Sequence, residues 1–145
     1  MRVYLDNCCY NRPFDDQGQL RVRLETEAKL HVQGLMHSGA IEYAWSDVLD
    51  YELAQSPYPE QSADILAWKG RATVDVALDP GLVERGAQIE ADSGVKPMDA
   101  LHLACADAAG CDWFLTTDRG ILKKRNNLGR LWVANPIDFV LEEHT

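Results

Sequence analysis

Short apolar segments alternate with helix-length segments along the whole chain, and this alternation is what most constrains the fold. The strand-like segments are 2–6, 41–45, 113–117 and 131–134, with a shorter one at 74–76. The segments between them carry helical periodicity, capping residues or helix-opening prolines. Strands separated by helices are typical of parallel sheets covered on both faces. We therefore expect an α/β protein with three layers, α/β/α, around a central, mainly parallel sheet.

The predicted helices are bounded by ordinary start and stop signals, such as Ser46, Pro80 and Pro97 at their beginnings and Gly39 and Gly110 at their ends. They cover 20–39, 47–55, 60–69, 81–91, 97–110 and 136–140, with a short helix at 121–126. The chain contains no internal repeat, linker or low-complexity segment. A length of 145 residues is enough to bury a sizeable core, so we expect one domain over 1–145.

Hydrophobicity, the N-terminal sequence and the cysteine pattern limit the classes of protein to which this chain can belong. No apolar stretch approaches the roughly 20 residues that span a bilayer, and the N-terminus has no signal-peptide pattern. We therefore expect a cytoplasmic protein without a membrane partner. The four cysteines form no regular disulfide framework. His102 and Cys105 share a helix face, but core packing is favoured over a zinc site because no second pair has a similar spacing.

Four acidic residues far apart in sequence are predicted to meet at one edge of the sheet. Asp6 ends the first strand, and Asp118 follows the strand at 113–117. Asp99 lies in the first turn of the helix that leads into that strand, and Glu52 lies on the helix that follows the strand at 41–45. The carboxyl ends of parallel strands share one edge, where ligands bind.

Each of these acids also has a structural explanation of its own. Asp6 and Asp118 are suited to helix caps or turns, Asp99 is favourable at a helix N-terminus, and Glu52 is suited to an exposed helix face. Together, however, like charges in one crevice are costly unless a cation compensates them. Carboxylate oxygens suit Mg²⁺ or Mn²⁺. The four residues therefore form a candidate site for one of these ions.

Basic residues are concentrated in a chain whose net charge is −9. The segment 119–130 reads RGILKKRNNLGR and contains five cations and no acid, and Arg12, Arg21 and Arg23 form a smaller cluster. Alone, such a strip is usually a solvated helix face and loop. Because it begins one residue after Asp118, a role in binding phosphate groups is an equal alternative.

The stretches YLDNCCYNRP, SDVLDYEL, KPMDALHLACA and FLTTDRGILKK, in this order, resemble PIN-domain proteins. That family contains metal-dependent ribonucleases, including many VapC-type toxins of bacterial toxin–antitoxin pairs. The resemblance extends to VANPIDFV near the C-terminus. It implies that Asp6, Glu52, Asp99 and Asp118 hold Mg²⁺ or Mn²⁺. The register of Glu52 is open, because Asp47 and Asp50 are close to it in sequence.

The resemblance also suggests residues that support the metal ligands. Asn7 and Thr117 lie next to Asp6 and Asp118, where their side chains are expected to orient ligands or water. The N-terminal turn NCCYNRPFDD departs from the common family pattern. A role for Asn11 and Arg12 that is specific to a subfamily therefore remains a hypothesis.

The implied reaction is hydrolysis of RNA by metal-activated water, with phosphates bound by Arg12, Arg119, Lys123 and Lys124. The expected partners are RNA, a small antitoxin protein and a second copy of the chain. An apolar stripe of Leu24, Ala28, Leu35 and Met36 would form the contact with a protein partner. The alternatives are a non-catalytic RNA-binding or scaffold protein of the same fold, and a phosphatase with a nucleophilic Asp6. The phosphatase is disfavoured because Cys8 stands where a second acid is usual.

Overall fold

The structure, a computed structural model, describes residues 1–143. Five strands form one sheet in the order β3-β2-β1-β4-β5, and every neighbouring pair is parallel. The strands are β1 (Arg2–Leu5), β2 (Glu42–Ser46), β3 (Val74–Val76), β4 (Trp113–Leu115) and β5 (Trp132–Ala134). The predicted fold class is confirmed, since helices cover both faces of a wholly parallel sheet.

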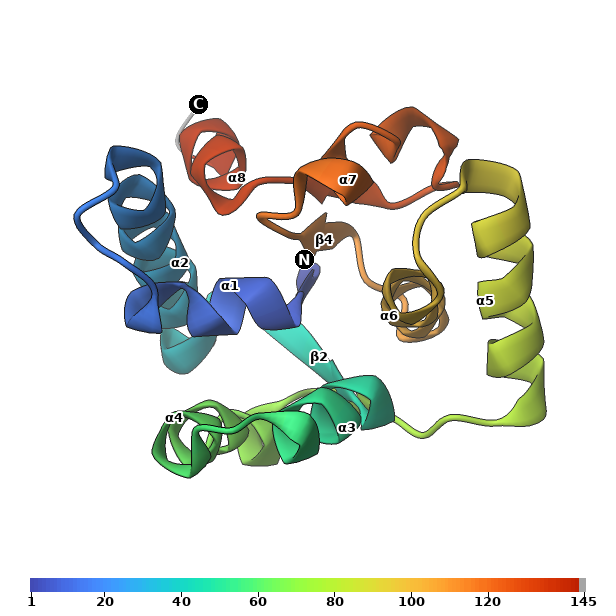
Figure 1. Ribbon diagram of the computed structural model, residues 1–145, viewed down its shortest axis with the longest axis horizontal. Coiled ribbons are helices and arrows are strands. Elements are labelled where there is room, and N and C mark those ends of the chain that lie inside the picture. The colour runs from blue at the N-terminus through green and yellow to red at the C-terminus, as the bar shows by residue number, and fades with distance from the viewer. Residues whose placement is uncertain (144–145) are drawn as a thin grey trace.

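The helices follow the strands in sequence. They are α1 (Asn7–Asn11), α2 (Leu20–Ser38), α3 (Asp47–Gln55), α4 (Pro59–Leu66), α5 (Pro80–Ser93), α6 (Pro97–Ala108), α7 (Arg119–Leu122) and α8 (Pro136–Glu143), with three 3-10 turns, η1 (Arg12–Phe14), η2 (Lys69–Arg71) and η3 (Arg125–Asn127). Figure 1 shows α2 on one side of the central strands and α5 and α6 on the other. None of the helices in residues 1–143 combines the length and hydrophobicity needed to cross a bilayer.

The central strand β1 is buried on both faces, which explains its unbroken apolar sequence. Val3, Tyr4 and Leu5 are almost fully enclosed, as expected for the middle strand of a parallel sheet. The Tyr4 ring stacks on Phe114 of β4, with centroids 5.4 Å apart. Leu5 pairs with Leu115 in register. The residues that follow these two strands, Asp6 and Thr116, therefore leave the sheet side by side.

Some element boundaries differ from the sequence-based expectations for local reasons. The N-terminal turn contains a short helix, α1, because the Asp6 carboxylate accepts a hydrogen bond from the Asn7 N–H and begins it. The helix expected over 60–69 ends at Leu66 and gives way to η2. The helix expected over 121–126 begins two residues earlier, because Asp118 caps it.

Helix α2 does not present the predicted apolar stripe as one surface. Ala28 and Met36 are buried, whereas Leu20 and Leu24 are 60% and 48% exposed. The buried face also carries the polar residues Glu25, Thr26, Lys29 and Gln33. The apolar surface of α2 that a protein partner can reach is therefore limited to its N-terminal turns and Leu30.

Candidate metal centre at the carboxyl edge of the sheet

Asp6 is buried at the end of β1, and both of its carboxylate oxygens accept hydrogen bonds. Oδ1 accepts from the Asn7 N–H at 2.8 Å. Oδ2 accepts from the Thr116 hydroxyl at 2.8 Å and from the Cys8 thiol at 3.4 Å. These donors come from α1 and from the residue after β4. Together they hold the carboxylate in one orientation at the sheet edge.

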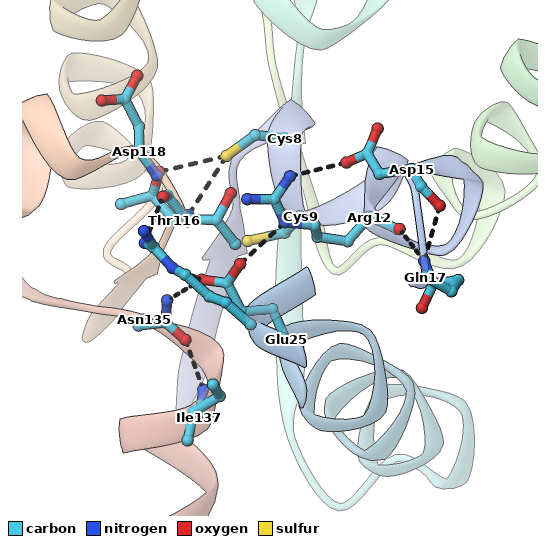
Figure 2. A network of polar contacts seen from close by, with 12 residues as sticks. Cys8, Cys9, Arg12, Asp15, Gln17, Glu25, Thr116, Asp118, Asn135 and Ile137 are labelled. Atoms are coloured by element: carbon cyan, nitrogen blue, oxygen red, sulfur yellow. Dashed lines mark hydrogen bonds and ion pairs between the residues drawn. The ribbon is translucent and has the colours of Figure 1, made fainter. Parts of the chain in front are cut away.

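Thr116 joins Asp6 to Asp118. Its hydroxyl donates to Asp6 and accepts the Asp118 N–H at 3.0 Å. The Asp118 carboxylate caps α7, where Oδ1 accepts the Gly120 N–H at 2.7 Å. Figure 2 shows that this carboxylate points away from Cys8 and Thr116. In residues 1–143 its second oxygen, Oδ2, accepts no hydrogen bond, so Asp118 combines a capping role with a free acceptor.

Glu52 reaches the same edge from α3 and contacts His102 of α6. Its Oε1 forms a short hydrogen bond with His102 Nε2, and the same nitrogen lies 3.8 Å from Asp6 Oδ1. The other ring nitrogen, Nδ1, lies 2.6 Å from the Tyr4 hydroxyl, which is also 2.6 Å from Ser46 Oγ. One ligand atom each from Asp6, Glu52 and His102 lies within 4.8 Å of the others.

The acids and His102 influence one another's ionisation. Burial would lower the pKa of His102, but the hydrogen bond to Glu52 and the charges of Asp6, Glu52 and Asp99 raise it overall. Burial, assisted by the charges of Asp6 and Asp118, raises the pKa of Asp99 to about 6. Asp99 does not belong to the group within 4.8 Å, but it is close enough for the other acids to disfavour its charged form.

The donor set at this edge fits a hard divalent cation. Four carboxylates lie at or near this edge, after β1, on α3, on α6 and before α7, and no lysine or arginine in residues 1–143 forms an ion pair with them. The side-chain oxygen of Asn7, next to Asp6, is buried without a hydrogen-bond partner. Hard oxygens with unsatisfied charge are the ligands that Mg²⁺ and Mn²⁺ prefer.

The residues considered as alternatives to Glu52 lie elsewhere. Asp47 and Asp50 form a second acidic group with Asp75. Lys69 Nζ is 2.9 Å from Asp50 and 3.8 Å from Asp75. Of the acids on α3, Glu52 is therefore the one that lies with Asp6. His102 and Cys105 do not form a site together, because neither group of potential ligands in residues 1–143 contains Cys105.

A buried carboxylate, Glu25, lies beside the site and is fully neutralised by the protein. Its oxygens accept from Arg12 Nε at 3.0 Å, from Arg21 Nε at 3.3 Å and from the Asn135 amide. Figure 2 shows Glu25 between Arg12 and Asn135. Arg12 also pairs with Asp15 at 2.8 Å, and Arg21 donates to the Thr117 carbonyl at 3.3 Å. Arg12 is thus held by two acids, a position in which its charge is largely compensated.

The predicted phosphate-binding cations of the basic strip differ in their surroundings. Arg119 and Lys123 are exposed, and neither forms an ion pair in the described residues. Lys124 Nζ donates to the Gly94 carbonyl at 2.6 Å, which joins α7 to the end of α5. Arg119 and Lys123 therefore remain open to an outside anion, whereas Lys124 is engaged within the protein.

Sequence reasoning missed three residues at this edge. His102 was considered only with Cys105, although its position three residues after Asp99 places both on one face of α6. Thr116 was overlooked in favour of Thr117, whose N–H contacts the Cys8 sulfur at 3.4 Å. Tyr4 was considered only as a strand residue. The strand register, which aligns Leu5 with Leu115, is the information that brings Thr116 to Asp6.

The family model of the PIN domain matches residues 42–127, a range that contains Glu52, Asp99 and Asp118 and begins after Asp6. No curated protein gives a significant match. VapBC2 from Rickettsia felis, in a structure with a DNA fragment from their promoter, is similar with a TM-score of 0.59 and 16% identity over 93% of this chain and 98% of that chain. DNA-bound VapBC from Salmonella typhimurium is similar with a TM-score of 0.53 and 17% identity over 94% of this chain and 98% of that chain. At these identities the two structures support the fold.

Proposed function

Because this chain belongs to the PIN-domain family, we propose that it is a metal-dependent ribonuclease that hydrolyses RNA phosphodiester bonds. The observation that carries the proposal is the meeting of Asp6, Glu52 and His102 within 4.8 Å at the carboxyl edge of the sheet. The raised pKa of Asp99 supports it, since burial and the charges of Asp6 and Asp118 cause it and no lysine or arginine in residues 1–143 forms an ion pair with these acids.

We assign the metal ligands to Asp6, Glu52, Asp99 and Asp118, with Mg²⁺ or Mn²⁺ as the ion. The chemistry that such an ion supplies is ionisation of water near neutral pH and compensation of charge on the scissile phosphate. The Asn7 N–H and the Thr116 hydroxyl orient the Asp6 carboxylate. His102, held by Tyr4, orients Glu52. These contacts have the role that supporting residues have around known metal sites.

Substrate phosphates are assigned to exposed cations beside the acidic edge. Arg119 begins α7 directly after Asp118, and Lys123 follows the end of this helix. Their charges would position the backbone without selecting a sequence. Arg12 is also a candidate. Because Glu25 and Asp15 already compensate its charge, it is less available to a substrate phosphate.

The biological setting that we propose is a toxin–antitoxin pair in the cytoplasm, with 1–145 acting as one PIN-like domain. The two similar structures described above are complexes named VapBC and bound to DNA. A small antitoxin would cover apolar surface, and a second copy of the chain is the other expected partner. Leu20 and Leu24 on α2 offer such surface. A neighbouring small open reading frame that encodes a DNA-binding protein would support this setting, and its absence would favour another nuclease role.

A non-catalytic RNA-binding or scaffold protein of the same fold is the second candidate. The observation that favours it is that Asp6 and Asp118 both cap helices, which gives each a role without a metal. Purified protein incubated with mixed single-stranded RNA separates the two candidates. Cleavage that requires Mn²⁺ or Mg²⁺ and stops with chelator supports the nuclease, whereas binding without cleavage in either ion supports the second candidate.

A further inference from the structure

Two surface grooves share part of their lining and form one continuous path. The smaller has a volume of about 370 Å³ and is lined by Arg119, Leu122 and Lys123. The larger, about 700 Å³, extends along the edge strand β5 toward α8. Arg125 and Asn126 line both grooves. Arg119, which lies at the start of this path, directly follows Asp118 in the sequence.

The first part of this path is positively charged and unpaired. Arg119, Lys123 and Arg125 are exposed and form no ion pair within residues 1–143. Two other cations of the same segment, Lys124 and Arg130, are engaged by Gly94 and Asp107. In a chain with a net charge of −9, three neighbouring cations without acids form a local site for an anionic backbone.

The second part of the path presents an exposed aromatic surface. Trp132 of β5 is 67% exposed and pairs in register with Trp113 of β4. The two rings lie 5.9 Å apart at 31°, and Trp113 is fixed in turn by an edge contact with Phe139 at 5.2 Å. Trp132 is therefore a large exposed ring whose neighbour on the adjacent strand is itself packed against Phe139. This arrangement suits stacking with a nucleic acid base.

The charges in the two linings differ. The larger groove contains an acid, Asp138, beside Trp132, and its cation Arg130 is already paired with Asp107. The smaller groove has cations and no acid. A strand that follows the path would place its phosphates on the cations and turn a base toward Trp132.

We propose that this path binds single-stranded RNA that flanks the cleaved bond, with phosphates on Arg119, Lys123 and Arg125 and one base stacked on Trp132. The proposal rests on the proposed ribonuclease function. The alternative occupant is a second copy of the chain, because an exposed edge strand can pair with a strand of another molecule. RNA is favoured because the cations adjoin the aromatic surface and because Arg119 directly follows Asp118 in the sequence.

Binding is measured with the full chain and a fluorescently labelled, single-stranded oligonucleotide in chelator, where cleavage does not interfere. Trp132→Ala should raise the dissociation constant about 5- to 100-fold, the loss expected for one stacked base. Trp132→Phe should restore most of the affinity. Because the other tryptophans are less exposed than Trp132, RNA should quench tryptophan emission in the wild type and much less in Trp132→Phe. Arg125→Gln should weaken binding and reduce its dependence on salt.

Matched controls are Tyr58→Ala, which removes another exposed aromatic ring, and Arg85→Gln, which removes an exposed cation on α5. Both should bind as the wild type does. The proposal is overturned if Trp132→Ala and Arg125→Gln bind as tightly as these controls, or if the wild type binds no RNA. It is also overturned if Trp132→Ala converts a dimer into a monomer in light scattering while RNA binding is unchanged, because the face is then an interface between copies.

The assay distinguishes this proposal from the proposed function. If the wild type cleaves RNA with Mn²⁺ and the path variants bind normally, the ribonuclease assignment stands and the path is rejected. If the path variants lose binding but the wild type cleaves nothing in either metal, the path stands and catalysis is rejected.

Discussion

Residues 1–143 contain two groups of potential metal ligands, and the protein compensates their charges differently. In the group of Asp47, Asp50 and Asp75, Lys69 lies 2.9 Å from Asp50, which also accepts the Trp45 indole N–H at 2.9 Å. In the group of Asp6, Glu52 and His102, only the imidazole supplies positive charge, and its own protonation depends on those acids.

This difference shows why clustered acids alone do not identify a metal site. A permanent cation such as Lys69 reduces the electrostatic reason to bind a metal ion, although burial and the charges of Asp50 and Asp47 still raise the pKa of Asp75. At the carboxyl edge of the sheet, Asp99 keeps a pKa of about 6 because burial and the other acids oppose its charge. We therefore propose the edge with Asp6 as the metal site, in preference to the group beside Lys69.

The largest expected effect is on catalysis by Asp6→Asn. The change preserves volume but removes a charged ligand, and we expect the rate of RNA cleavage to fall by more than about 100-fold, beyond the loss typical of supporting residues. Asp75→Asn changes the other acidic group in the same way and should keep wild-type activity. Initial rates with Mn²⁺ check both. If the two variants were equally active, the proposal that the metal binds the group with Asp6 and not the group with Asp75 would be contradicted.

The next effect is on stability and comes from His102. Replacement by Leu leaves the Tyr4 hydroxyl and the Glu52 carboxylate without their shared partner. We expect the free energy of unfolding to fall by about 2 kcal/mol, measured by urea denaturation. His37→Gln, which changes an exposed histidine whose contact with Arg71 is at the surface, should have a much smaller effect. A wild-type unfolding curve for His102→Leu would mean that the imidazole does not hold this edge together.

A smaller effect is the pH dependence of stability in metal-free protein. The folded-state pKa of Asp99, about 6, lies above its usual value of 3.8, so folding disfavours the charged form and stability is lost as pH rises between these values. Asp99→Asn removes this penalty. Its advantage in melting temperature should be small at pH 4 and complete by pH 7, and should correspond to about 1–2 kcal/mol after allowance for partial exposure. An advantage that does not change with pH would contradict the assignment.

The smallest effect concerns Lys69→Gln. Because the lysine is half-exposed and its contacts are at the surface, we expect little change in melting temperature. The change should nevertheless turn Asp47, Asp50 and Asp75 into a weak second binding site for Mn²⁺, detectable by calorimetry. If Lys69→Gln gains no such site, the lysine is not what distinguishes the two groups.

The sequence predicted the architecture well because its signals were local. Apolar runs, capping residues and prolines located the strands and most helices, and the position of Asp6 after a buried strand predicted its place at the sheet edge. The supporting contacts of the site were not predictable, since they depend on register and packing. Thr116 reaches Asp6 only because Leu5 pairs with Leu115, and His102 reaches Glu52 only because α3 and α6 approach one another.

The most direct test of the central claim, that the acids at the sheet edge hold a divalent cation, is the shift in melting temperature on adding Mn²⁺ to the wild type and to Asp99→Asn. A metal that binds only the folded wild type adds about 2.7 kcal/mol at 100 times its dissociation constant, which is a rise of several degrees. We predict that Asp99→Asn melts above the wild type in chelator at pH 7 and gains little from Mn²⁺. A variant that melts below the wild type in chelator and responds to Mn²⁺ equally would contradict the account, and Asp99 would then be only a favourable residue at the start of α6.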